Sequence, residues 1–244
     1  MVAILPFIIL LAAFLPAAIW LVIFLHEDLH PEPRHLILYV FSIGILITIP
    51  VLGSQIAFQK ISNLSPDGSL FFIIGIVVIE EIFKFCAGYF AVWKNTDFDE
   101  PMDAMIYLIV AALGFATVEN LFTVVTQMFG NYVAPTSIVV ETLALRFIGA
   151  TLLHTLTAGI VGYYWAVGIM KKEVVRYVAM GLVLAILVHT VFNYLMYLYQ
   201  DINVLYPTIF LVGVAFFVIE DFQKIKEDER EGKGFDIIKR YGRK

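Results

Sequence analysis

Side chains that can transfer protons occur in this sequence inside long apolar runs, where a charged group is costly to bury. Carboxylates and imidazoles serve as acids and bases in hydrolysis, and amides and imidazoles donate hydrogen bonds to developing negative charge. A group of this kind in an apolar run therefore needs either a partner or a chemical role. The candidates are Glu80, Glu81, Lys84, Glu119, Asn120, Arg146, His154, His189 and Asn193.

The spacing of these residues places several of them on common helical faces. Glu80 and Glu81 lie four and three residues before Lys84, so one ammonium group can neutralise either carboxylate. His189 and Asn193 are also four residues apart, so their side chains project toward the same spot. Two adjacent carboxylates, a third in another segment and two histidines exceed what packing between helices requires. The pattern favours a catalytic site over simple polar contacts.

The elements that must hold these residues are membrane-spanning helices. Apolar residues make up 61% of the 244 positions, charged residues only 15%, and the mean hydropathy is +0.88. A soluble domain does not need so much apolar surface, whereas a helix that crosses the hydrocarbon needs about 20 apolar residues. We therefore predict an all-α, polytopic membrane helix bundle of about seven transmembrane helices. They are expected at residues 3–25, 36–57, 69–92, 103–129, 137–168, 175–199 and 204–221.

Residues on different membrane helices can meet only if they lie at a common depth. Glu81, Glu119, His154 and His189 all fall within roughly one to two turns of the middle of their predicted spans, since the rise is about 1.5 Å per residue. A single site near the bilayer midplane is therefore feasible. Water must then reach this depth through a cavity between the helices.

Orientation follows from lysine and arginine, because positively charged loops stay in the cytoplasm. Eight of the 16 basic residues lie in the tail that begins at Lys224, and the loop with Lys171 and Lys172 falls on the same predicted side. Lys60 is the basic residue expected on the opposite side. With seven spans, the N-terminus lies outside and the C-terminus is cytoplasmic. We predict a transmembrane helical domain at residues 1–221 and a charged cytoplasmic tail at 222–244.

Four polar motifs follow one another along the chain, namely Glu80-Glu81-Ile82-Phe83-Lys84, Phe115-Ala116-Thr117-Val118-Glu119-Asn120, Arg146 with His154 eight residues later, and His189-Thr190-Val191-Phe192-Asn193. Their order resembles that of the PrsW family of intramembrane proteases. PrsW proteins are related to the CAAX prenyl endopeptidases and the Abi family, whose motifs are a double glutamate, Phe-xxx-His and His-xxx-Asn. A glutamate replaces the histidine of the second motif here, which separates this chain from true CAAX processing enzymes.

The resemblance implies a glutamate-dependent, metal-independent endopeptidase without a cofactor, acting on membrane-anchored protein substrates in the lipid bilayer. By similarity to the CAAX enzymes, Glu80 is the base that activates water, helped by His154. The oxyanion contacts are assigned to His189 and Asn193. A multi-pass location in the cell membrane follows, and nothing suggests a nucleic-acid partner. The expected catalytic set is Glu80, Glu81, Glu119, His154, His189 and Asn193, with Lys84 and Arg146 balancing charge.

Metal-dependent hydrolysis is the main alternative mechanism. The segment from His26 to His30 spells HExxH, which on a helix provides two zinc ligands and a base. Its context is poor, because Pro31 biases His30 out of the α region and the segment lies at the end of a predicted helix. A second option is a zinc ion held jointly by Glu81, Glu119, His154 and His189.

Two functions other than proteolysis also stay open. Relays of carboxylates and histidines in membrane helices mark proton pathways, so the chain could be a proton-coupled transporter. Against this, the two halves of the sequence show no inverted repeat. A receptor or assembly factor would explain the helices but would leave the clustered carboxylates without a purpose.

Overall fold

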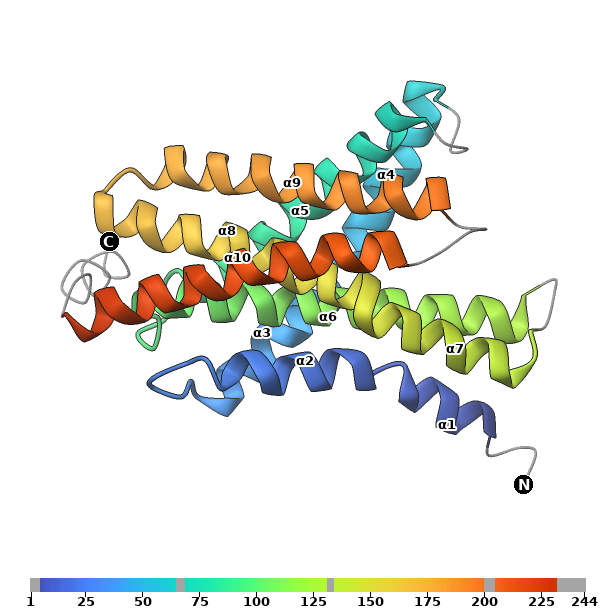
Figure 1. The fold of residues 1–244 in the computed structure, drawn as a ribbon, viewed down its shortest axis with the longest axis horizontal. Helices are drawn as coiled ribbons and strands as arrows, with labels where there is room; N and C mark the ends of the chain where they lie inside the picture. Colours follow the sequence, from blue (N-terminus) through green and yellow to red (C-terminus); the bar gives the residue numbers. More distant parts are fainter. Residues whose placement is uncertain (1–4, 65–68, 131–133, 200–204, 232–244) are drawn as a thin grey trace.

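The computed structural model describes residues 5–64, 69–130, 134–199 and 205–231, and the regular elements within these ranges are all helices. Figure 1 shows a bundle in which α6, α8, α9 and α10 run along its length, with α3, α4 and α5 crossing more obliquely. The helices are α1 (Leu5–Ala12), α2 (Leu15–Leu25), α3 (Arg34–Leu46), α4 (Thr48–Ser62), α5 (Leu70–Val92), α6 (Pro101–Phe129), α7 (Thr136–Arg146), the π-helical turn η1 (Phe147–Thr151), α8 (Leu152–Lys171), α9 (Val174–Tyr199) and α10 (Leu205–Arg230).

The predicted polytopic membrane bundle is confirmed. Five helical stretches are long and apolar enough to cross a membrane, namely residues 34–62, 101–129, 136–171, 174–199 and 205–230. Helix α5 has 23 residues but carries three charged side chains at its centre, and the apolar stretch at Ile9–Leu25 is shorter. The crossing of the membrane by these last two segments therefore stays a prediction.

Two of the predicted single helices are each broken before a proline. The predicted helix 3–25 divides into α1, which ends at Ala12, and α2. The predicted helix 36–57 bends where α3 ends at Leu46. Pro16 and Pro50 lie four residues beyond these two ends. A proline ring clashes with the carbonyl group four residues earlier and offers no N–H, which accounts for the position of both breaks.

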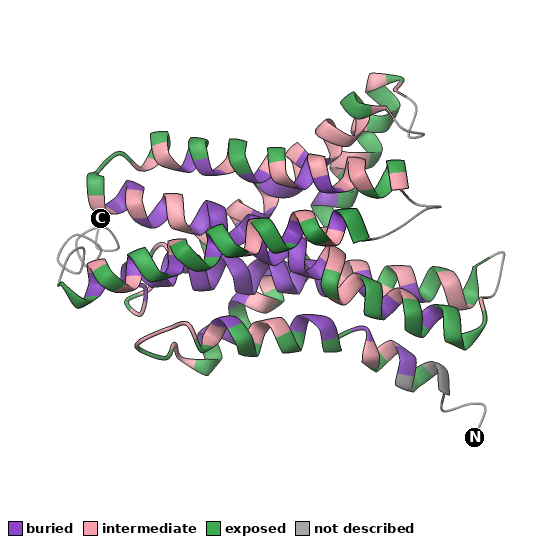
Figure 2. Ribbon diagram, in the orientation of Figure 1, coloured by how far each residue is buried: buried purple, intermediate pink, exposed green. Residues whose placement is uncertain are grey.

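Helix α6 is the centre of the bundle. Every residue from 101 to 117 is buried, and Figure 2 shows this buried core running through the middle of the molecule. Glycines allow its neighbours to approach closely: a Cβ atom on Gly44 of α3 would lie 2.0 Å from the Ala111 carbonyl oxygen, and one on Gly162 of α8 would lie 2.5 Å from the Met105 Cα atom. The backbones of α3, α6 and α8 therefore pack directly against one another.

The last helix continues past the predicted end of the membrane domain. Helix α10 runs to Arg230, so residue 221 lies inside a continuous helix. Lys226 pairs with Glu27 at 2.5 Å, and Glu229 Oε1 accepts a hydrogen bond from the Met102 backbone at 2.7 Å. The first part of the predicted tail is thus joined to the bundle, while residues 232–244 lie outside the described part of the chain.

Candidate active site

Lys84 lies at the centre of a buried polar cluster and contacts three acceptors. Its ammonium nitrogen is 2.6 Å from Glu81 Oε1, 3.1 Å from His154 Nδ1 and 3.3 Å from Thr157 Oγ1. An ammonium group has three N–H donors and no acceptor, so each donor has one partner. His154 Nδ1 must then accept, which assigns the imidazole proton to Nε2. The Glu81–Lys84 pair predicted from their spacing is present, and both side chains are buried.

His189 joins the two adjacent glutamates of α5. Its Nδ1 atom lies 2.6 Å from Glu81 Oε1, and its Nε2 atom lies 3.6 Å from Glu80 Oε2. The rings of His154 and His189 meet edge to face, with centroids 5.2 Å apart. Residues from α5, α8 and α9 therefore meet in one place, as the common depth of their positions predicted.

Glu119 links His154 to Arg146. Its Oε2 atom is 2.9 Å from His154 Nε2 and 3.1 Å from Arg146 Nη2. The Arg146 Nε atom donates to Asn120 Oδ1 at 2.5 Å, and the Asn120 amide donates to Thr151 at 3.1 Å. Glu119 and His154 thus form a second carboxylate–imidazole pair beside that of Glu81 and His189. Arg146 and Asn120 fix its position.

The π-helical turn η1 explains why Arg146 and His154 reach the same carboxylate. Eight residues of regular α-helix turn through about 800°, which would leave the two side chains roughly 80° apart. The wider π turn takes up one extra residue, so the two positions return to nearly the same face. This turn was not predicted from the sequence.

Gln55 is a functional candidate that the sequence analysis missed. Its amide nitrogen donates to Glu80 Oε1 at 2.7 Å from helix α4, a helix to which no motif was assigned. The charges of the cluster explain why the contact between Gln55 and Glu80 matters. Glu81 pairs with Lys84 and Glu119 with Arg146, so Glu80 is the carboxylate whose nearest polar contacts are an amide and an imidazole.

Asn193 is placed less centrally than predicted. It lies one helical turn after His189 on α9 and is partly exposed, whereas His189 is buried. Within the described ranges, no hydrogen bond joins its amide to Glu80, Glu81 or His189. The amide is therefore not part of the hydrogen-bonded network, which leaves its donor free for another group.

The residue types of the cluster fit a divalent metal ion. One ligand atom each from Glu80, His154 and His189 lies within 4.8 Å of the other two, the one such group found in the described residues. Two imidazoles and a carboxylate form the donor set of many catalytic zinc sites. Glu81 contacts the far nitrogen of His189, as carboxylates commonly do behind metal-binding histidines. The set differs from the predicted one, since Glu80 replaces Glu81 and Glu119.

The HExxH segment does not form the helical pair that a zinc site requires. Helix α2 ends at Leu25, and the His26 Nδ1 atom lies 2.6 Å from the Val22 carbonyl oxygen. His30 is exposed and contacts Glu100 at 2.9 Å. This hydrogen bond to a carboxylate raises the pKa of His30. The two histidines have separate local partners at the end of the bundle.

Comparison with known proteins gives consistent matches. The sequence matches the family described as PrsW family intramembrane metalloprotease over residues 32–219. It is 28% identical to Protease PrsW of Oceanobacillus iheyensis over 194 residues, which are 77% of this chain and 82% of the relative. It is 29% identical to Protease PrsW of Geobacillus kaustophilus over 144 residues, so the match spans 58% of the length of each.

Protease PrsW of Bacillus subtilis is 25% identical over 177 residues, covering 71% of this chain and 75% of the relative. No solved structure matches the chain. The matched range 32–219 contains every residue of the buried cluster, from Gln55 on α4 to His189 on α9.

Proposed function

Because the chain belongs to the PrsW family of intramembrane proteases, we propose that it hydrolyses peptide bonds of membrane-anchored proteins at the buried cluster around Glu80. The proposal rests on the proximity of Glu80, His154 and His189, since one nitrogen or oxygen atom of each lies within 4.8 Å of the other two in the middle of the bundle. Each is fixed from behind by a polar neighbour: Glu80 by an amide, and each histidine by a carboxylate. Such fixed positions lower the cost of arranging the reacting groups.

Glu80 is the proposed general base. It takes a proton from water, and the resulting hydroxide adds to the carbonyl carbon of the scissile bond. The pairing of the nearby lysine and arginine suits this role, because Lys84 neutralises Glu81 and Arg146 neutralises Glu119, and neither forms an ion pair with Glu80 in the described part of the chain. The C–N bond then breaks, and the proton held by Glu80 passes to the leaving amine.

The developing oxyanion needs hydrogen-bond donors near Glu80. His189 is the first candidate, since Glu81 at 2.6 Å from Nδ1 stabilises the imidazolium that donates from Nε2. Asn193 is the second, because its amide is not engaged by the cluster. His154 has both ring nitrogens engaged, by Lys84 and by Glu119, so its part is to hold these two groups in place beside Glu80.

A metal-dependent form of the same hydrolysis is favoured by the donor set and by the description of the matching family. Glu80, His154 and His189 would hold the ion, and His154 Nδ1 would bind it in place of the hydrogen bond from Lys84. Once bound, it would lower the pKa of a coordinated water and polarise the substrate carbonyl. Glu81 and Glu119 would then act behind the two imidazoles and fix their orientation.

The test is cleavage of a transmembrane model peptide by the purified protein in liposomes. We expect Glu80→Gln to lower the rate by at least about 100-fold, because general bases contribute that much or more. Glu141→Gln is the matched control, since Glu141 is an exposed glutamate on the neighbouring helix α7. Equal activity of the two variants would contradict the role of Glu80.

Chelator treatment and metal analysis distinguish the two mechanisms. Activity that survives a chelator, in protein without stoichiometric metal, supports the glutamate mechanism. Loss of activity on chelation and recovery with zinc, together with lower metal content in His189→Ala, supports the metal-dependent mechanism. Absence of cleavage for several transmembrane peptides would contradict the protease proposal as a whole.

A further inference from the structure

A cavity of about 490 Å³ lies between helices α4 and α6, beside the candidate active site. Its apolar part includes Ile49 and Leu52 of α4 and Phe122 of α6. Its polar part is formed by Gln55, Glu119 and Arg146. The volume is in the range of pockets that hold small ligands or a few side chains.

The polar end of the cavity is continuous with the catalytic cluster. The Gln55 amide donates a hydrogen bond to Glu80 Oε1 at 2.7 Å, and Glu119 Oε2 lies 2.9 Å from His154 Nε2. Arg146 pairs with Glu119 at 3.1 Å. A polypeptide segment in the cavity would therefore lie next to the groups that are proposed to cleave it.

The apolar end of the cavity faces the lipid. Ile49, Leu52 and Phe122 are 70%, 53% and 65% exposed, and they lie on the stretches 34–62 and 101–129, which are long and apolar enough to cross a membrane. A segment that enters here comes sideways from the bilayer, without passing through water. The cavity thus suits a membrane-embedded polypeptide better than a soluble one.

The polar groups indicate that the bound segment is extended. A helix satisfies its own backbone hydrogen bonds, whereas an unwound stretch in lipid leaves N–H and C=O groups that require partners. Gln55, Glu119 and Arg146 offer both donors and acceptors at the inner end of the cavity. A peptide bond must also leave the helical conformation before water can attack its carbonyl group from the side.

Helix α4 is the more adaptable wall of the cavity. Val51 is the one buried residue among its 15, and a Cβ atom on Gly53 would contact nothing within 4 Å. The helix begins after the break at Ile47 and ends at Ser62, and the next residue, Asn63, has a left-handed conformation with φ of 53°. Helix α4 therefore contributes little to the core around α6, while Gln55 connects it to Glu80.

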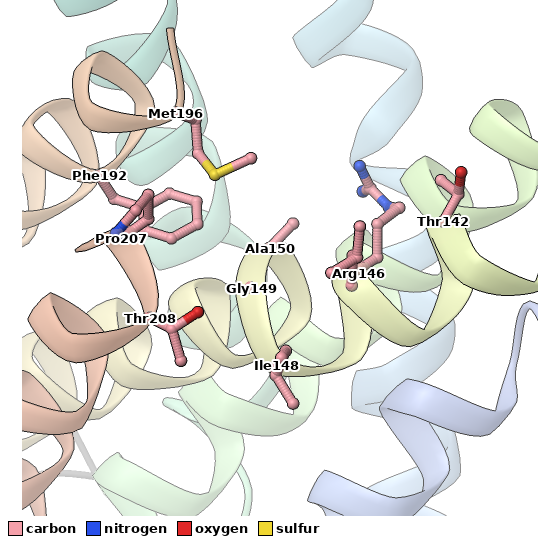
Figure 3. Close-up of a pocket in the computed structure, with 10 residues that line it drawn as sticks. Thr142, Arg146, Ile148, Gly149, Ala150, Phe192, Met196, Pro207 and Thr208 are labelled. Atoms are coloured by element: carbon pink, nitrogen blue, oxygen red, sulfur yellow. The ribbon is translucent and has the colours of Figure 1, made fainter. Parts of the chain in front are cut away.

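A second cavity on the other side of Arg146 is a weaker candidate. It has a volume of about 220 Å³ and lies between η1, α9 and α10. In Figure 3, Phe192 and Met196 face Ala150, and Arg146 lies on the opposite side of the cavity from Pro207. Among the described residues that line it, there is no carboxylate, so it has no direct contact with an acid or base of the cluster.

We propose that the substrate enters laterally between α4 and α6 and binds the 490 Å³ cavity as a short extended stretch of a transmembrane segment. This inference rests on the proposed protease function. Leu52 and Phe122 contact the apolar side chains of the segment, and Gln55, Glu119 and Arg146 bind its exposed backbone. The apolar residues of the cavity then determine which side chains are accepted next to the cleavage site.

Site-specific photocrosslinking tests this binding without requiring turnover. A benzophenone amino acid replaces Leu52, Met196 or Phe216 in the Glu80→Gln protein. Each variant is reconstituted in liposomes with the same transmembrane peptide that is used in the cleavage assay of the wild type. Met196 samples the second cavity, and Phe216, which is 61% exposed on α10, samples the lipid-facing surface. We expect peptide adducts from position 52 and few from positions 196 and 216. Stronger labelling from position 196, or equal labelling from all three, would overturn the inference.

A kinetic comparison separates this inference from the protease proposal. Leu52→Trp narrows the cavity and should raise KM about tenfold with little change in kcat, because it removes binding shared by the ground and transition states. Met196→Trp adds the same bulk to the other cavity and should leave both constants nearly unchanged. If the wild type cleaves the peptide and the two variants have identical KM values, the entry route is refuted and the protease function is not. If the wild type does not cleave, the protease function itself is refuted.

Discussion

At the scale of single residues, Lys84 holds the two halves of the active site together. It neutralises Glu81, which in turn contacts His189, and it donates to His154, which contacts Glu119. A charge at the middle of a membrane helix is stable only while an opposite charge and hydrogen bonds compensate for its lost hydration. Lys84 is therefore a positioning residue on which the geometry of both histidines depends.

Removal of Lys84 should destabilise the protein strongly. Lys84→Met leaves Glu81 buried without its cation, and breaking a buried pair in this way typically costs about 3–5 kcal/mol. Thermal unfolding in detergent measures the effect. Lys60→Met is the control, since Lys60 is exposed at the end of α4. Equal midpoints for the two variants would show that the Glu81–Lys84 pair does not support the fold.

The sequence was sufficient to predict the charged residues of the site but not their neutral partners. Glu80, Glu81 and His189 stood out because ionisable groups are rare inside apolar helices. Gln55 carries no charge and lies near the end of a predicted span, so nothing in the sequence distinguished it from a lipid-facing or packing residue. Its contact with Glu80 depends on how α4 packs against α5, which is a tertiary feature.

At the scale of elements, η1 is the feature that aligns the second half of the site. The turn is also held from outside: the Trp20 indole of α2 donates to the Phe147 carbonyl at 2.9 Å and stacks on the Phe147 ring. A π turn is costly in isolation and persists where other contacts stabilise it. Helix α2 thus contributes to the orientation of Arg146 and His154 through its contacts with Phe147.

Loss of the indole hydrogen bond should weaken this turn. Trp20→Phe keeps an aromatic ring for stacking but leaves the Phe147 carbonyl without its donor, at a cost of about 1–2 kcal/mol. Thermal unfolding and the cleavage rate should both decrease. Trp93→Phe is the comparison, because Trp93 stacks on Tyr89 while its indole N–H has no hydrogen bond to the described residues. A Trp20→Phe protein as stable as Trp93→Phe would exclude a supporting role for this contact.

Local rules explain some element boundaries and not others. The breaks before Pro16 and Pro50 follow from the proline ring itself and could have been predicted from the sequence. The π turn could not, because it holds one residue in excess of a regular α-helix and is stabilised by a tertiary contact, the hydrogen bond from Trp20 to Phe147. A count of hydrophobic residues does not reveal such an excess, so the stretch 136–171 looks like a regular helix.

At the scale of the whole molecule, basic residues gather at one end of the bundle. Figure 1 shows that the turns after α2, α5 and α8 and the end of α10 lie at the same end. These segments contain or adjoin Arg34, Lys94, Lys172 and Lys226, whereas Lys60 lies at the opposite end. If positively charged segments stay in the cytoplasm, this end of the bundle is the cytoplasmic one, and the orientation stays a prediction.

Labelling of introduced cysteines tests both this orientation and the crossing of the membrane by α5. In a Cys86→Ser background, which removes the single native thiol, we expect Asn63→Cys to react with an impermeant maleimide on intact cells. Lys94→Cys should react only after permeabilisation. Asn63 and Lys94 are exposed residues on either side of α5, so the two results together require that helix to span the bilayer. The reverse pattern would invert the topology. Labelling of both residues from outside would mean that the helix with Glu80, Glu81 and Lys84 does not cross, and the buried cluster could then not lie at mid-membrane.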